Sequence, residues 1–151
     1  MCRIWSHAGI SRRRKLDIYM SCVVSKLLYS LESVWLVQHE RLRLDAFHHS
    51  CLRKMLGIQH SYLSRVPNSE VLSAAALPLL SQLLTDRQIS LYKKIAGSSC
   101  ESFAKALVCT DIGTPRTWYH KRRRGRPRQM WAESVYFLSL HACVFSHVPA
   151  R

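Results

Sequence analysis

One short stretch of the chain concentrates the residues whose types and spacing could do chemistry. Lys121–Trp131 reads KRRRGRPRQMW, and six of its eleven residues carry a positive charge while none carries a negative one. Arginine offers a planar fork of donors that grips phosphate bidentately, and it stays charged at any working pH. The candidate nucleic-acid-binding residues are therefore the cations of this run: Lys121, Arg122, Arg123, Arg124, Arg126 and Arg128.

Inside this run, Arg124–Pro127 (RGRP) matches the core of the AT-hook, a short motif that reads the minor groove of A/T tracts. Narrow grooves concentrate negative potential and attract inserted arginine. A four-residue match leaves two alternatives open: a nuclear localisation signal and a solvated, disordered charge run. Trp131 could stack on a base or anchor the next helix, and we favour the anchor because Val135 and Leu138 share its face.

The remaining residues show no arrangement typical of a catalytic site. Two-metal nucleotidyl transfer needs carboxylates that share ions about 4 Å apart. The acidic residues here are scattered singly: Asp17, Glu32, Glu40, Asp45, Glu70, Asp86, Glu101, Asp111 and Glu133. The clusters HHSC (48–51) and HACVFSH (141–147) lack paired ligands at zinc-finger spacing, and no glycine-rich phosphate loop is present. We expect no enzymatic activity, metal or cofactor from this chain's own residues.

Composition restricts the class of partner. The 151 residues fit one domain with or without a tail, and 48% hydrophobic residues allow a real core. With 23 Lys+Arg against 9 Asp+Glu, the net charge of +14 attracts polyanions. The longest apolar run, Val135–Val148, is shorter than the roughly 20 residues of a membrane span. We expect an intracellular chain with a nucleic-acid partner and no membrane.

The cysteines follow no metal or disulfide pattern. Six are present, none in a CxxC pair, and the first residues show no apolar secretory segment. Disulfides are not expected without an export route, so most of the thiols should be small buried hydrophobes.

Hydrophobic spacing predicts the elements that must position the basic residues. Between Leu16 and Leu31 the apolar residues recur at helical intervals, which predicts a helix over roughly 14–37. A second helix is predicted from about Glu40 to Leu56, with Gly57 as its C-terminal cap. This second helix carries two further candidates for nucleic-acid contact, Arg53 and Lys54.

Shorter helices follow. Asn68 can cap one helix, Ser81 can start another that Gly97 ends, and a last helix is predicted from Gln129 onward. Nothing alternates like a strand, so the fold is predicted to be all-α: a small helical bundle, a basic and partly disordered segment, and a C-terminal helix. The predicted organisation is a tail at 1–13, a bundle at 14–96, a linker at 97–120 with one short helix around 102–108, and the basic segment with its helix at 121–151.

Five segments, taken in order, resemble LINE-type reverse transcriptases, the polymerases of retrotransposons without long terminal repeats. They are KLDIYMSCVVSKLLYSLESVW (15–35), RLDAFHHSCLRKMLGI (43–58), RVPNSEVL (65–72), LPLLSQLLTDRQ (77–88) and RRRGRPRQMW (122–131). The resemblance covers about Lys15 to Val135, with a poorly similar gap near 97–115. It implies that the chain corresponds to the helical thumb, which packs against the template–primer duplex, and to the segment just after it.

The resemblance also assigns positions. Leu27, Leu28, Tyr29 and Glu32 fall on the family's LLYGxE helix; Cys51, Leu52, Arg53 and Gly57 on its CLRxxLGI helix; and Gly125, Arg126, Pro127 and Trp131 on its GRPxxxW element. Ser30 stands where the family has glycine, Glu133 where an Asp often follows, and the Gly-His pair after 77–88 is missing. From Tyr136 onward no likeness remains.

The palm, whose aspartates bind Mg²⁺ in the parent polymerase, has no counterpart in this sequence. The leading interpretation is therefore a nucleic-acid-contacting fragment of such an enzyme, inactive alone, in the nucleus and with an RNA–DNA hybrid as the favoured partner. Two alternatives stay open: a stand-alone AT-hook-like DNA-binding protein, and a non-functional translated relic.

Overall fold

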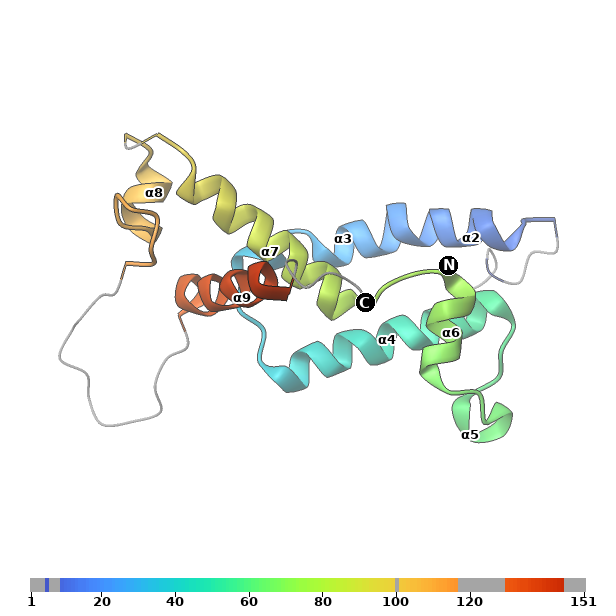
Figure 1. Cartoon of the computed structure of the whole chain (residues 1–151). Helices are drawn as coiled ribbons and strands as arrows, with labels where there is room; N and C mark the ends of the chain where they lie inside the picture. The colour runs from blue at the N-terminus through green and yellow to red at the C-terminus, as the bar shows by residue number, and fades with distance from the viewer. Residues whose placement is uncertain (1–4, 6–8, 100, 117–129, 146–151) are drawn as a thin grey trace. The chain divides into compact units, whose positions relative to one another are not determined.

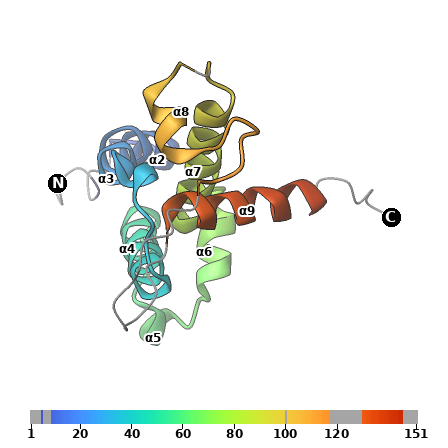
Figure 2. The same cartoon turned by 90° about the vertical axis from the view of Figure 1, so that its left-hand side faces the viewer.

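The computed structural model describes residues 5, 9–99, 101–116 and 130–145, with side chains placed to residue 140 (Figures 1 and 2). The predicted all-α class is confirmed: the described residues form helices and turns, and the only pairing of extended backbone among them is an isolated bridge between Cys109 and Pro115. The candidate cations at 121–128 lie outside the described residues.

The chain divides into two compact units, which differs from the expected single bundle at 14–96. The first unit comprises Met1–Leu31 and Leu36–Leu84, and the second comprises Glu32–Trp35 and Thr85–Arg151. The boundary falls inside α7 (Leu80–Ala96). Leu80 and Leu84 at its start are buried in the core of the first unit, whereas Tyr92 is buried in a separate core. One helix thus supplies apolar residues to two cores, and its sequence periodicity alone does not reveal the division.

The first unit is built on two long helical segments that lie side by side (Figures 1 and 2). One consists of α2 (Arg12–Ile18), a π-helical segment (Tyr19–Val24) and α3 (Ser25–Leu28). The other is α4 (Gln38–Leu56), which also packs against α6 (Asn68–Ala75). Between α4 and α6 lies the single turn α5 (Ser61–Ser64).

The first predicted helix ends earlier than expected. It was predicted over roughly 14–37, but α3 ends at Leu28 and only a short 3₁₀ turn (Leu31–Ser33) follows. Tyr29 leaves the helical region with ψ 128°, and Ser30 adopts φ 65°. A left-handed residue cannot continue a right-handed helix. Sequence periodicity missed this stop because the apolar spacing continues past it.

Two expected caps have different outcomes. Gly57 has φ 72° and caps α4, as predicted. Asn68 was expected to cap the next helix, but Pro67 occupies the cap position and Asn68 is the first helical residue. The side-chain oxygen of Asn68 accepts a hydrogen bond from Arg53 (2.9 Å).

The core of the first unit contains a buried polar chain. Tyr19, Leu28, Leu52, Val71 and Leu84 are among its fully buried residues. Beside them, the Tyr19 hydroxyl lies 2.8 Å from Nδ1 of His48, and Nε2 of His48 lies 3.2 Å from the carbonyl oxygen of Pro78. Since a carbonyl only accepts, Nε2 carries the proton and the tyrosine donates to Nδ1. His48 is therefore satisfied in its neutral form.

The second unit packs around aromatic residues. It contains the rest of α7, α8 (Phe103–Val108) and α9 (Trp131–Phe145). Its core consists of Tyr92, Cys109, Ala132 and Val135, with Trp131 packed against it. The indole nitrogen of Trp131 donates to the carbonyl oxygen of Glu32 (2.9 Å), which confirms its expected role as an anchor.

The segment expected as a linker at 97–120 takes part in this packing where the structure describes it. Cys109 is buried, and the Tyr92 hydroxyl donates to the carbonyl oxygen of Gly113 (2.9 Å). The expected short helix near 102–108 is present as α8. In the described residues, no helix has the length and apolar character that crossing a membrane requires.

Candidate nucleic-acid interface

Of the residues proposed to contact nucleic acid, the structure places two. Lys121, Arg122, Arg123, Arg124, Arg126 and Arg128 lie outside the described residues. Arg53 and Lys54 lie in the last turn of α4, where the chain reverses at Gly57. They have opposite environments: Arg53 is buried and Lys54 is exposed.

Arg53 holds the loop that joins α4 to α6. Its Nη1 donates to the carbonyl oxygen of Gln59 (3.1 Å) and to the Ser64 hydroxyl (3.3 Å). Its Nη2 donates to the carbonyl oxygen of Val66 (2.6 Å) and to the side-chain oxygen of Asn68 (2.9 Å). We call this set of four hydrogen bonds the arginine clamp. The guanidinium is thus engaged inside the protein, and the expected role of Arg53 as a direct nucleic-acid contact stays a prediction.

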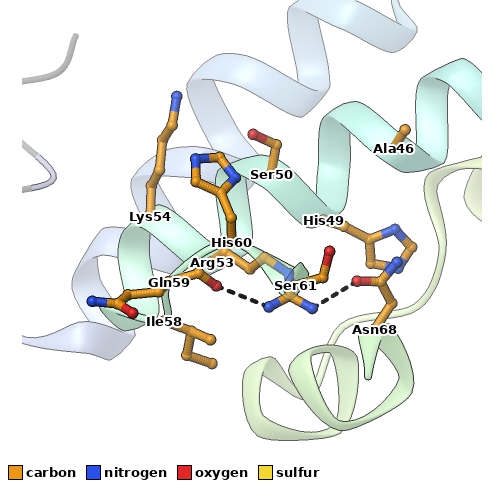
Figure 3. Close-up of a pocket in the computed structure, with 10 residues that line it drawn as sticks. All are labelled: Ala46, His49, Ser50, Arg53, Lys54, Ile58, Gln59, His60, Ser61 and Asn68. Atoms are coloured by element: carbon orange, nitrogen blue, oxygen red, sulfur yellow. Dashed lines mark hydrogen bonds between the residues drawn. The ribbon is translucent and has the colours of Figure 1, made fainter. Parts of the chain in front are cut away.

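A pocket of about 380 Å³ opens beside the clamp. Figure 3 shows it between the end of α4, the loop and the start of α6, with the Arg53 guanidinium between Gln59 and Asn68. Its lining contains basic, polar and apolar side chains but no carboxylate: Ala46, His49, Ser50, Arg53, Lys54, Ile58, Gln59, His60, Ser61 and Asn68. We call it the α4–α6 pocket.

One wall of the pocket has an unsatisfied polar atom. Nε2 of His49 is buried and has no hydrogen-bond partner in the described structure. Buried polar atoms are nearly always paired, so this nitrogen is an exception, and its burial keeps it out of contact with the open space of the pocket. The neighbouring His48 differs, because both of its ring nitrogens have partners within the fold.

Sequence reasoning missed this pocket, although a signal existed. His49, Ser50, Arg53 and Lys54 recur at the three- and four-residue intervals that place side chains on one helix face. The HHSC segment (48–51) suggests either metal ligands or a buried thiol, and neither interpretation indicates a pocket. The closing wall, 58–68, comes from a loop whose path depends on the arginine clamp, and no sequence pattern fixes that path.

An aromatic pair flanks the pocket. His60 lines it and stacks on Tyr62, with ring centroids 6.1 Å apart and an interplanar angle of 18°. Tyr62 is 78% exposed, which leaves ring surface free to meet a partner. Exposed aromatic faces beside basic side chains are typical of single-stranded nucleic-acid sites.

The surface of the first unit is strongly basic. Its exposed charged side chains, among the residues described, are seven cations and two carboxylates: Arg12, Arg13, Arg14, Lys26, Arg43, Lys54 and Arg65 against Asp17 and Glu70. Two other acidic side chains accept hydrogen bonds from backbone amides. Glu40 accepts from the Val37 amide (2.8 Å) and Asp45 from the Ser81 amide (2.9 Å). Both carboxylates thus stabilise helix starts, and the exposed charge of the first unit remains mostly positive.

The described residues provide little for covalent or metal chemistry. Burial raises the pKa of the Cys51 thiol, against smaller lowering effects from Lys54 and from a hydrogen bond with Tyr19, so the reactive thiolate is disfavoured. Cys22, Cys51 and Cys109 are free thiols. In the part of the chain with placed side chains, no three His, Cys, Asp or Glu residues gather as metal ligands.

Comparison with known proteins leaves the site to be interpreted from its own geometry. No protein-family model, curated protein or solved structure matched the chain.

Proposed function

We propose that this chain binds nucleic acid through its basic surface, as a fragment of a LINE-type reverse transcriptase that has no catalytic palm and no polymerase activity alone. The observation that carries the binding proposal is the surface of the first unit, with seven exposed cations against two exposed carboxylates among its described residues. Such a field attracts phosphate backbones, and the candidate cations at 121–128 would add to it.

Local geometry supports the family assignment at two motif positions. Ser30, where the family has glycine, adopts φ 65°, and Gly57 of the CLRKMLGI segment adopts φ 72°. Glycine reaches this left-handed region without a steric penalty, which explains a preference for it at such positions. In the parent polymerase, Mg²⁺ would be bound by the palm, which this sequence does not contain.

The favoured partner is an RNA–DNA hybrid, in the nucleus. The test is a competition among a hybrid, an A/T-rich duplex and a G/C-rich duplex. Binding is measured by fluorescence anisotropy at salt concentrations between about 50 and 200 mM. We expect the hybrid to bind best, with affinity falling steeply as salt rises. Salt-independent or absent binding would overturn the proposal.

The same competition separates the alternatives. A stand-alone AT-hook-like protein would prefer the A/T-rich duplex, and replacing Arg124 and Arg126 by alanine would abolish that preference. A translated relic would bind nothing selectively and would unfold without a cooperative transition.

A further inference from the structure

The α4–α6 pocket combines features that a general basic surface does not have. It is concave, and its lining contains basic and hydroxyl side chains but no carboxylate. Lys54 at its edge is exposed. The Arg53 guanidinium forms part of the wall, so its charge reaches the pocket even though its donors serve the clamp.

The ligand that matches this lining is a phosphate group. A phosphate presents several strong acceptor oxygens and negative charge, which suits ammonium, hydroxyl and ring N–H donors. Lys54, His60 and the hydroxyls of Ser50 and Ser61 line the same pocket as His49 (Figure 3). A cation would find no carboxylate there, and an apolar ligand would leave these donors unsatisfied.

The aromatic pair extends the site beyond the phosphate. His60 belongs to the pocket and stacks on Tyr62, whose ring is mostly exposed. A nucleotide whose phosphate entered the pocket could place its base on the free face of Tyr62. A double-stranded partner keeps its bases stacked inside, so this arrangement requires an unpaired nucleotide.

We propose that the α4–α6 pocket is a subsite for one unpaired nucleotide, which holds its backbone phosphate between Lys54 and His60 and stacks its base on Tyr62. The inference rests on the proposed function for its source of phosphate, a phosphodiester within a single strand. It differs from the hybrid-binding surface because it takes one nucleotide in a defined place.

The test uses the whole chain and a single-stranded oligothymidylate of about eight nucleotides with a free 5′-hydroxyl. Lys54→Gln should weaken binding about tenfold and reduce the salt dependence of log K by about 0.7, the contribution of one phosphate contact. The matched control is Lys93→Gln, which removes the same charge from an exposed residue of α7 and should change affinity less than about twofold.

Stacking is tested separately. Tyr62→Ala should weaken binding about tenfold, while Tyr62→Phe keeps a ring and should retain affinity. Tyr29→Ala is the control, since Tyr29 is 82% exposed at the end of α3 and lies outside the pocket lining.

Histidine ring resonances separate failure of this inference from failure of the proposed function. The ring signals of His60, assigned by their loss in His60→Gln, should shift when the oligonucleotide is added. If it binds without shifting them, and if Lys54→Gln weakens binding no more than Lys93→Gln, the subsite is excluded and general nucleic-acid binding stands. If only inorganic phosphate shifts them, the pocket takes a free anion and the nucleotide inference fails, whereas the competition with the hybrid decides the proposed function independently. If binding requires a 5′-phosphate, the site takes a strand end and the internal phosphodiester is excluded.

Discussion

Two regions of the molecule, the loop between α4 and α6 and the core around α9, are held in place by different kinds of interaction. The loop is held by one buried guanidinium that donates to four oxygens spread over Gln59–Asn68. The second unit is held by rings: Tyr92 lies 6.3 Å from Trp131 and 6.1 Å from Tyr136, measured between ring centroids. Hydrogen bonds are directional, whereas packed rings tolerate small displacements. The arginine clamp therefore fixes one specific path of the loop.

This difference bears on function. An irregular loop of backbone carbonyls cannot be buried cheaply, and a single cation that satisfies several of them keeps the loop folded. The same loop supplies His60 and Ser61 to the α4–α6 pocket. The arginine clamp therefore shapes the α4–α6 pocket, whereas the aromatic packing of the second unit supports a core.

The largest expected effect comes from removing the clamp. Arg53→Met should reduce the free energy of unfolding by about 3 kcal/mol, because buried oxygens lose a charged donor. Arg53→Lys should restore little, since one ammonium cannot reach four separated acceptors. Urea denaturation measures the loss, and Arg43→Met on an exposed part of α4 is the control.

Hydrogen exchange sharpens the same comparison. Arg53→Met should speed amide exchange in 58–75 and leave α9 protected. Equal loss of protection in both regions would contradict the assignment of the clamp to the loop.

The buried His48 adds a pH dependence to the first unit. Burial lowers its pKa below the ordinary 6.5, as does the neighbouring His49, while the Pro78 carbonyl and Asp45 oppose the shift. Above about pH 6.5 the folded and unfolded forms are both neutral, so this contribution to stability is complete. As pH falls below that value the unfolded chain binds a proton that the folded chain excludes, and stability decreases.

Protonation would also remove the acceptor that Tyr19 uses on Nδ1. Urea midpoints measured from pH 8 to pH 5, a range around the ordinary pKa of histidine, should fall for the natural chain and fall less for His48→Gln. An identical slope in both proteins would show that His48 is not the group responsible.

The sequence predicted what depends on local patterns. Apolar periodicity located α4, glycine located its C-terminal cap, and the face shared by Trp131 and Val135 indicated the anchor. What it missed depends on partners distant along the chain. Asn68 has the residue type of a helix cap, but Arg53 engages its oxygen from 15 positions away. The division inside α7 likewise depends on which distant residues pack on each end.

The candidate site shows the same limit. The basic run at 121–128 is visible as composition, whereas the α4–α6 pocket requires a loop to fold back over one helix face. The sequence predicts that Arg53 and Lys54 lie next to each other on one helix. Only the packing of the folded chain shows that Arg53 is buried in the clamp while Lys54 is exposed.

A smaller effect is expected in the second unit. Trp131→Phe keeps an aromatic ring in the core but removes the donor to the Glu32 carbonyl, so it should cost about 1 kcal/mol. Exchange should quicken in α9 and not in 58–75, the reverse of Arg53→Met. The control Phe137→Leu changes an exposed ring of the same helix and should leave stability nearly unchanged.

The smallest effect concerns Ser30, where the first helical segment ends. Its φ of 65° is costly for a residue with a Cβ and easy for glycine, whereas glycine loses more backbone entropy on folding. Ser30→Gly should therefore raise the free energy of unfolding by about 0.5 kcal/mol, a small difference between a larger steric gain and an entropic loss. Ser33→Gly, at an exposed position in the following turn, is the matched control and should destabilise. Thermal melts of both variants measure the difference, and a lower melting temperature for Ser30→Gly would mean that the serine side chain contributes more than its backbone strain costs.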